Sequence, residues 1–355
     1  LSAADYTKRG TICLLNKDYD QAIADFTEAI RLDPQLVPAY SNRGAIWIIK
    51  KQYDHAIADF DQAIQLDPSA RRYRIRGTTW MIKKQYDMAI ADFGEAIRLD
   101  PSARYYSIRG TAWEAMADYD KAIADFSEAI RLDPKVAKVY SLRGKARTAK
   151  EDYDKAIADY DEAIRLEPSA EYYTGRGIAW FLKKDHDKAI ADYSEAIRLD
   201  PKVAVAYVNR GDAWRAKREH VKAIADYDEA IRLDADLAPA YDKRGDTWRI
   251  SKDYDKAIAD YSEAIRLDPA AKVYNDRGAT WLAKKDYDKA LADFSEAIRL
   301  GPSAGHYGNR AGTWFLKKDY DAAIADYNEA IRLDPSAGFY RVRGDAWKAK
   351  NEYDK

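Results

Sequence analysis

The stretch Tyr40-Ser41-Asn42-Arg43-Gly44-Ala45-Ile46-Trp47, followed by Ala56-Ile57-Ala58-Asp59-Phe60 and then by Leu66-Asp67-Pro68, decides the fold. It returns along the chain every 33 or 34 residues, so the chain is a repeat array. The opening element, Tyr-x-x-Arg-Gly, begins at Tyr6, Tyr40, Tyr73, Tyr106, Tyr140, Tyr173, Tyr207, Tyr241, Tyr274 and Tyr340, and at Tyr307 with Ala311 in place of glycine. The repeats cover approximately residues 1–34, 35–68, 69–101, 102–134, 135–168, 169–201, 202–235, 236–269, 270–302 and 303–335, with a partial eleventh over 336–355.

Each repeat is predicted to form two helices. In the first repeat Tyr6, Gly10 and Cys13 are spaced i, i+4, i+7 and share one helical face, and Ala22 and Phe26 share a face of a second helix. Lysines end the first helix and aspartates begin the second, so each charge opposes the local helix dipole. A proline usually ends the second helix, because proline cannot continue a helix. The sequence therefore predicts an all-α chain of antiparallel helix pairs.

The pattern resembles the tetratricopeptide repeat, which reads W-x2-L-G-x2-Y, then A-x3-F, then P. Here the same elements appear as Tyr40-x2-Arg43-Gly44-x2-Trp47, Ala56-x3-Phe60 and Pro68, and the match extends over essentially the whole chain, as in long bacterial-type arrays. The resemblance implies a single right-handed superhelical solenoid over residues 1–355. It also implies that first helices line a concave groove, which in this family usually holds a peptide or a partner helix.

The composition argues against two classes of partner. The chain has 59 basic and 60 acidic residues, a net charge of −1, whereas binding to nucleic acid or to an anionic membrane needs a surplus of Lys and Arg. With 34% charged residues, no apolar run is long enough to span a bilayer. We expect a cytoplasmic protein with no nucleic-acid and no membrane partner.

No arrangement of residues that performs catalysis emerges from the sequence. A phosphate-binding loop, a nucleophile elbow and metal-ligand spacings are all missing. His186 and His220 lie one repeat apart at a position where other repeats have tyrosine, which favours packing over metal binding. We expect no enzymatic activity, no cofactor and no metal site.

Arginine replaces the family's leucine in every repeat, from Arg9 to Arg343. An unpaired arginine that points inward costs several kcal/mol of desolvation. Each complete repeat carries an aspartate sixteen residues later: Asp25, Asp59, Asp92, Asp125, Asp159, Asp192, Asp226, Asp260, Asp293 and Asp326. Because a guanidinium can bind a carboxylate through two hydrogen bonds, we predict an ion pair between the two helices of each repeat. The alternative, that these arginines clamp an acidic ligand, stays open.

By the family resemblance, positions −3, +1, +4 and +5 from the repeated glycine, together with −6 near the helix start, line the groove. These positions vary freely between repeats, as a recognition surface should. The predicted binding residues are Leu14, Ile48, Arg71, Arg74, Met81, Arg104, Lys138, Lys145, Phe181, Arg215, Asp242, Asp246, Arg249, Leu282 and Phe315. The face is thus apolar in repeats one to three, basic in three to five and acid-leaning in seven and eight.

The apolar part of this face contains two neighbouring rows. The +4 row is predicted to be exposed in the groove, and the +5 row to pack between neighbouring helices. The rows are Leu14, Ile48 and Met81 at +4, and Leu15, Ile49 and Ile82 at +5. For the basic cluster, a merely solvated surface remains the alternative to a binding site.

The sequence predicts a protein–protein interaction scaffold that binds a peptide or partner segment in the groove. One alternative is a self-assembling structural array that stacks head to tail, and another is the regulatory or targeting region of a larger protein whose catalytic domain lies elsewhere. The chain begins in a first helix and stops where the second helix of the eleventh repeat is due. We therefore expect a piece of a longer protein, or ends that stack on neighbouring molecules.

Overall fold

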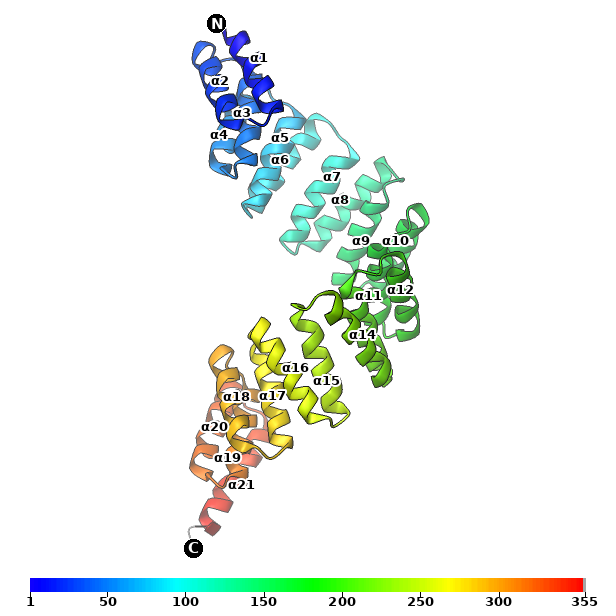
Figure 1. Cartoon of the computed structure of the whole chain (residues 1–355), viewed down its shortest axis with the longest axis vertical. Helices are drawn as coiled ribbons and strands as arrows, with labels where there is room; N and C mark the ends of the chain where they lie inside the picture. The colour runs from blue at the N-terminus through cyan, green and yellow to red at the C-terminus, as the bar shows by residue number, and fades with distance from the viewer. Residues whose placement is uncertain (354–355) are drawn as a thin grey trace. The chain divides into compact units, whose positions relative to one another are not determined.

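The computed structural model describes residues 1–353, which form 21 α-helices and no strand (Figure 1). The first helices of the repeats are α1 Ala3–Leu15, α3 Val37–Ile49, α5 Ala70–Ile82, α7 Ala103–Ala115, α9 Ala137–Ala149, α11 Ala170–Leu182, α13 Ala204–Ala216, α15 Ala238–Ile250, α17 Ala271–Ala283, α19 Ala304–Leu316 and α21 Ala337–Tyr353. The second helices are α2 Tyr19–Leu32, α4 Tyr53–Leu66, α6 Tyr86–Leu99, α8 Tyr119–Leu132, α10 Tyr153–Leu166, α12 His186–Leu199, α14 His220–Leu233, α16 Tyr254–Leu267, α18 Tyr287–Leu300 and α20 Tyr320–Leu333. The all-α prediction with two helices per repeat is confirmed.

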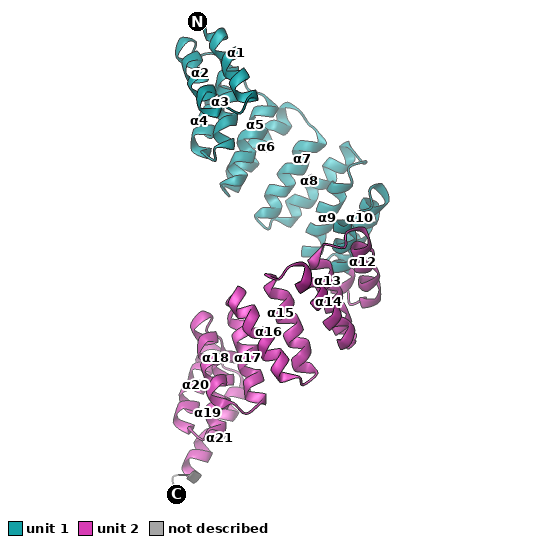
Figure 2. Ribbon diagram, in the orientation of Figure 1, with its two compact units in different colours: residues 1–179 teal, residues 180–355 magenta. Residues whose placement is uncertain are grey.

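The chain divides into two compact units, Leu1–Ala179 and Trp180–Lys355 (Figure 2). Within the N-terminal unit each helix from α1 to α10 packs against the helices next to it in the sequence. Helices α12 to α21 of the C-terminal unit pack in the same way. Within residues 1–353 no helix combines the length and the apolar character needed to cross a bilayer.

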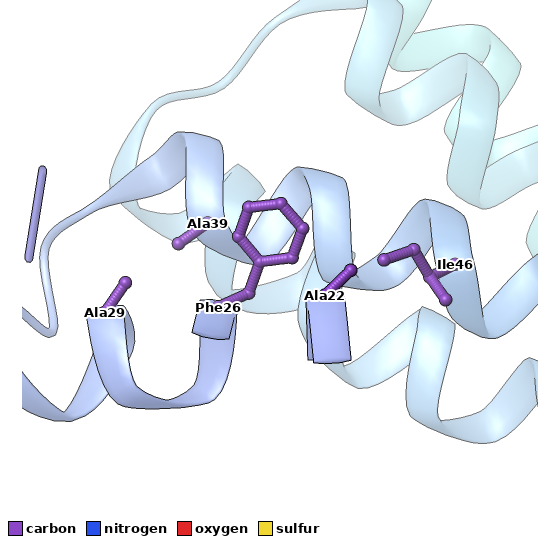
Figure 3. Packing of buried hydrophobic residues seen from close by; sticks show 5 residues of the cluster. All are labelled: Ala22, Phe26, Ala29, Ala39 and Ile46. Atoms are coloured by element: carbon purple, nitrogen blue, oxygen red, sulfur yellow. The ribbon is translucent and has the colours of Figure 1, made fainter. Parts of the chain in front are cut away.

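The core is built from small and aromatic side chains that join one repeat to the next. Ala22, Phe26 and Ala29 of α2 pack with Ala39 and Ile46 of α3, and all five are fully buried (Figure 3). Full burial of a phenylalanine side chain contributes about 1.5–3 kcal/mol. The aromatic residue of the second helix therefore stabilises both its own repeat and the contact with the following one.

Close approach of the two helices explains the repeated glycine. At Gly44 a β-carbon would lie only 3.0 Å from a ring carbon of Phe60 on α4. That distance is tighter than most contacts of a β-carbon, so the ring would have to shift by a few tenths of an ångström if α3 carried a side chain here, and glycine avoids this shift. The glycine of the Tyr-x-x-Arg-Gly pattern thus lies where the first helix of a repeat packs against the second.

The predicted arginine–aspartate pairs form inside the repeats. A terminal guanidinium nitrogen lies 2.5–2.8 Å from a carboxylate oxygen in nine repeats, and Nε donates a second hydrogen bond to the same carboxylate. The pairs are Arg9–Asp25, Arg43–Asp59, Arg76–Asp92, Arg109–Asp125, Arg143–Asp159, Arg210–Asp226, Arg244–Asp260, Arg277–Asp293 and Arg310–Asp326. The aspartates are buried, so each bidentate pair satisfies a carboxylate that would otherwise be costly to bury.

The remaining guanidinium nitrogen reaches the second helix of the preceding repeat. Arg143 Nη1 donates to Ser127 Oγ at 3.0 Å, and Arg244 Nη1 lies 2.5 Å from an oxygen of Asp228. Equivalent contacts join Arg43 to Thr27, Arg76 to Asp61, Arg176 to Asp161, Arg210 to Ser194, Arg277 to Ser262, Arg310 to Ser295 and Arg343 to Asn328. One side chain therefore links the two helices of its own repeat and the repeat before it.

The turn between the two helices has a left-handed residue in every complete repeat. In the first repeat Lys17 has φ 63°, its amide bonds to Leu14 O at 3.0 Å, and the Asp18 amide bonds to Cys13 O at 2.9 Å. These two bonds form a Schellman motif, in which glycine is the usual residue at the position of Lys17. Asp18 then caps α2 by accepting the backbone N–H of Gln21.

Candidate functional site

The apolar residues of the predicted face are half-buried. Leu14 packs against the cluster around Phe26, and Met81 against the cluster around Phe93. Ile48, Phe181, Leu282 and Phe315 are half-buried too. Leu14, Ile48 and Met81 are therefore less exposed than predicted, and Leu14 and Met81 contribute to the packing of their own repeats. Their place in a binding groove stays a prediction.

The neighbouring +5 row is exposed instead. Leu15 is 77% exposed, Ile49 52% and Ile82 48%, which contradicts their predicted place in the core. The physical reason is that these residues are the last of α1, α3 and α5, where the chain turns towards the second helix. The exposed apolar row of the N-terminal unit therefore lies one residue further along each first helix than the sequence suggested.

The structure brings together the three arginines predicted in repeats three and four. Arg71 and Arg104 are exposed and Arg74 is half-buried. Burial lowers the pKa of Arg74, and the positive charges of Arg104 and Arg71 lower it further. Within residues 1–353 none of the three forms an ion pair, so a concentration of positive charge is left without a balancing carboxylate. We call these three residues the arginine cluster.

Lys138 and Lys145 differ from the arginine cluster because each has an acidic partner on a neighbouring first helix. Lys138 Nζ lies 2.5 Å from a Glu171 oxygen, and Lys145 Nζ lies 2.8 Å from a Glu114 oxygen. Their charges are thus neutralised by the protein. Neither glutamate was predicted to matter, although both lie on the same face as the lysines.

The acid-leaning residues of the C-terminal unit form a connected polar network. Arg215 lies 3.1 Å from Asp212 and 3.5 Å from Asp246, and Arg249 lies 3.7 Å from Asp246. Lys272 completes the network, 3.0 Å from Asp242. The prediction placed Arg215, Asp242, Asp246 and Arg249 on one face, and the structure brings these four together.

Two buried tyrosines of the second helices belong to this network. Tyr227 and Tyr261 donate hydrogen bonds of 2.8 Å to Asp212 and Asp246. Burial raises the pKa of both phenols, so they stay protonated and act as donors. A sequence signal exists, because these repeats pair a tyrosine in the second helix with an aspartate after the glycine.

Three carboxylates of this network lie close enough to hold a divalent cation. Asp242, Asp246 and Asp276 have oxygens within 4.8 Å of one another. The ammonium of Lys272 lies 2.9 Å from Asp276 and 3.0 Å from Asp242, so a protein cation already balances their charge. We assign no metal site to them.

Comparisons with known proteins agree with the repeat pattern. Family models described as tetratricopeptide repeat match residues 3–36, 37–69, 103–136, 141–204, 191–238, 251–305 and 307–336, well over half of the chain. None of the curated proteins compared with the chain matches it.

Two solved structures are similar in fold. A tetratricopeptide repeat protein from Parabacteroides merdae is 16% identical, with a TM-score of 0.58 over 69% of this chain and 98% of that one. The C-terminal part of a TPR repeat-containing protein from Cytophaga hutchinsonii is 20% identical, with a TM-score of 0.51 over 66% of this chain and 97% of that one. At these identities the likeness concerns the fold alone.

Proposed function

This chain belongs to the tetratricopeptide repeat family, and from that premise we propose that it is a protein-interaction scaffold whose N-terminal unit binds a partner segment. The segment carries apolar residues followed by acidic ones. It lies along the first helices from α1 to α7, with its apolar part over repeats one to three and its acidic part at the arginine cluster.

The observation that carries this proposal is that Arg71, Arg74 and Arg104 have no acidic partner among the described residues 1–353. Elsewhere on the predicted face, Lys138, Lys145 and Arg215 are already paired with carboxylates. Three neighbouring like charges repel one another, and this repulsion adds to the lowering of the Arg74 pKa that burial causes. A carboxylate from a partner would relieve the repulsion and pair with a half-buried guanidinium, where an ion pair is screened less than at a fully exposed site.

The apolar part of the partner segment has a matching surface nearby. The exposed side chains of Ile49 and Ile82 end α3 and α5, beside the half-buried Ile48 and Met81. Removal of apolar area from water contributes about 25 cal/mol per Å², which gives affinity, while the arginine cluster gives direction and charge selectivity.

The C-terminal unit offers a weaker case for the same role. Its charged network is satisfied internally by Lys272 and by the hydroxyl groups of Tyr227 and Tyr261. A ligand would have to replace these contacts before it gained any of its own, so we place the recognition site on the N-terminal unit.

Selection from a displayed library of 12-residue peptides tests the proposal. Peptides selected on the chain should carry Asp or Glu after a run of apolar residues. Charge reversal of the cluster in an Arg71→Glu/Arg74→Glu/Arg104→Glu variant should weaken their binding at least about tenfold, since like charges then face each other. Binding to the unmodified chain should also weaken as salt is raised.

A matched control carries the same charge change on second helices. Arg98, Arg131 and Arg165 are 65–67% exposed and pair only with a glutamate three residues earlier. The Arg98→Glu/Arg131→Glu/Arg165→Glu variant should bind the selected peptides as the original chain does. Equal losses in the two variants, or selected peptides without acidic residues, would show that the arginine cluster is not the binding site.

A further inference from the structure

The edge of the molecule where the two helices of a repeat are joined carries a lysine over each of several tryptophan rings. Five repeats place a lysine eight residues after the tryptophan, with Nζ 4.1–4.5 Å from the ring centroid. The pairs are Lys121 over Trp113, Lys188 over Trp180, Lys222 over Trp214, Lys256 over Trp248 and Lys289 over Trp281. This is the first of two ammonium positions on the edge, and it is stabilised by a cation–π interaction.

The second ammonium position joins neighbouring repeats. An aspartate in the first turn of a second helix pairs with a lysine at the end of the next first helix. The pairs are Asp20–Lys50, Asp54–Lys83, Asp120–Lys150, Asp187–Lys217, Asp255–Lys284, Asp288–Lys317 and Asp321–Lys350. In all seven cases the partner of the aspartate is a lysine ammonium group.

The junction between the third and fourth repeats departs from the pattern at both positions. Met88 stands eight residues after Trp80, and Met116 stands where the next first helix would supply the lysine for Asp87. Met88 is 51% exposed and Met116 42% exposed. Asp87 stays in place and has no ion-pair partner among residues 1–353. By contrast, between repeats seven and eight both members of the pair are replaced together, by Val221 and Ile250, so no charge is left over.

A hollow in the N-terminal unit lies at the turn of repeat three. It measures about 600 Å³ and is lined by Trp80, Met88 and Met116 together with Asp87, Lys84 and neighbouring residues of the turn. We call it the methionine hollow. The equivalent turn of repeat six, with Lys188 and Lys217 at these two positions, is hollowed as well, so the methionines do not create the space but make its lining apolar. Methionine is flexible and polarisable, and it suits surfaces that adapt to an apolar side chain.

We propose that the methionine hollow is a second docking surface, which binds a partner segment with a lysine or arginine next to a bulky apolar side chain. The apolar side chain packs against Met88, Met116 and Trp80. The basic group pairs with Asp87, in the place that a lysine of the chain itself takes in other repeats. This ligand is opposite in charge to the one proposed for the arginine cluster, so the two surfaces recognise different segments.

The other repeats supply a variant that removes the apolar lining of the hollow without harming the fold. Met88→Lys/Met116→Lys restores the residues that other repeats carry, so a folded chain with an added Asp87–Lys pair is expected. Peptides from a displayed 12-residue library, selected on the unmodified chain and counter-selected on this variant, should carry Lys or Arg beside Leu, Phe, Ile or Trp. The selected peptides should bind the double variant at least about tenfold more weakly, because two exposed apolar side chains are lost. They should bind Asp87→Asn about two- to fivefold more weakly, as fits one exposed ion pair.

A matched control makes the same kind of change in the C-terminal unit. Val221→Asp/Ile250→Lys introduces the missing aspartate–lysine pair between repeats seven and eight. This variant should leave binding of the selected peptides unchanged. The three methionines of the chain provide a direct readout through ¹³C-labelled methyl groups. A selected peptide should shift the signals of Met88 and Met116 and leave Met81, on the first-helix face, in place.

The proposal is overturned if no peptide discriminates between the chain and the double lysine variant, or if the discriminating peptides are acidic. Shifts confined to Met81 would place the peptide on the first-helix face and not in the hollow. Sedimentation that shows the chain associating with itself, with loss of association in the double lysine variant, would make a second copy the occupant and would also overturn the proposal.

Discussion

Arginine at the family's leucine position acts as a connector. In repeat five Arg143 binds Asp159 through two hydrogen bonds and donates a third to Ser127 of the preceding repeat. A leucine there could only pack, whereas the planar guanidinium directs its donors to both partners at once. Burial of the guanidinium charge is tolerated because the carboxylate of Asp159 pairs with it. The contact with Ser127 helps to fix the packing of repeat five on repeat four.

Among the described residues Arg109 has no hydrogen-bond acceptor in the preceding repeat, and this leads to a prediction. The preceding repeat has Gly94 where the other nine complete repeats have serine, threonine, aspartate or asparagine. A β-carbon at Gly94 would meet Arg109 Nη1 at 3.8 Å, an ordinary contact. Gly94→Ser should stabilise the chain by about 1–1.5 kcal/mol, from helix propensity and from a hydrogen bond to Arg109. The change in urea midpoint of the N-terminal unit measures this.

The control for this prediction is Gly94→Ala, which improves propensity but adds no acceptor. Propensity alone ranks alanine above serine by about 0.5 kcal/mol. A serine variant that is more stable than the alanine variant therefore identifies the hydrogen bond. The reverse order would mean that the hydrogen bond contributes less than about 0.5 kcal/mol.

The fold was predictable because its signals are periodic and close in sequence. A spacing of 33 or 34 residues, a glycine facing an aromatic ring and an offset of sixteen between Arg43 and Asp59 all follow from two helices packed antiparallel. The acceptors that the preceding repeat offers, such as Thr27, could also have been found, because nine of ten complete repeats carry a polar oxygen at that position.

The binding face was less predictable, because it depends on how repeats rotate on one another. A helix turns by about 100° per residue, so a small difference in packing exchanges the roles of neighbours such as Ile48 and Ile49. The pairing of Lys138 with Glu171 joins first helices of successive repeats and has no fixed offset in the sequence. Likewise, no change of pattern at Ala179 marks the division into two compact units.

At the scale of the helix pair, the turn is where the fold accepts strain. Ten residues other than glycine adopt φ between 58° and 68°, one at each turn between paired helices. A left-handed conformation costs a residue with a β-carbon about 1–2 kcal/mol. Seven of the ten are lysine and the others are Ala117, Glu151 and Arg218, although glycine would fit better, so the turn is not optimised for stability.

Glycine in these turns is therefore expected to stabilise the chain. Lys51→Gly, Lys252→Gly and Lys285→Gly should each add about 0.5–1 kcal/mol, because relief of the left-handed strain exceeds the entropy that glycine returns to the unfolded chain. The three turns are far apart in the sequence, so their effects should add. Thermal unfolding followed by circular dichroism provides the measurement.

Alanine provides the control for the turn prediction. A lysine-to-alanine change at the same position keeps the β-carbon and should give no gain, as the native Ala117 at φ 58° in repeat four illustrates. Ala117→Gly should then stabilise the chain as the lysine changes do. Equal gains for alanine and glycine would point to loss of lysine charge as the cause.

At the scale of the whole molecule, the balanced charge has two roles. Part of it is structural, in the arginine–aspartate pairs and in the aspartate–lysine pairs between repeats. A smaller part has no ion-pair partner within the part of the chain that the structure describes, and this charge is positive at the arginine cluster and negative at Asp87. The net charge of −1 hides both, because it sums charges that the fold places in separate surroundings.

The repeated carboxylates also determine how stability depends on pH. Hydrogen bonds from Lys121 and Arg131 lower the pKa of Asp118 and Glu128, and other repeats contain the same contacts. A carboxyl with a lowered folded pKa contributes stability above its unfolded pKa of about 4 and loses that contribution as the pH falls through the folded value. Burial raises the pKa of Asp92, Asp242 and Asp260, which opposes this trend.

Since the lowered carboxyls outnumber the raised ones, we expect the urea midpoint to change little from about pH 7 to 5.5 and to fall steeply below about pH 4. A Glu128→Gln/Glu195→Gln/Glu229→Gln variant removes three contributors and should show a shallower acid slope. Asp260→Asn removes an opposing group and should make the slope steeper. A midpoint that rises on acidification would show that the buried aspartates dominate, because only a raised folded pKa makes the folded chain bind protons more readily than the unfolded one.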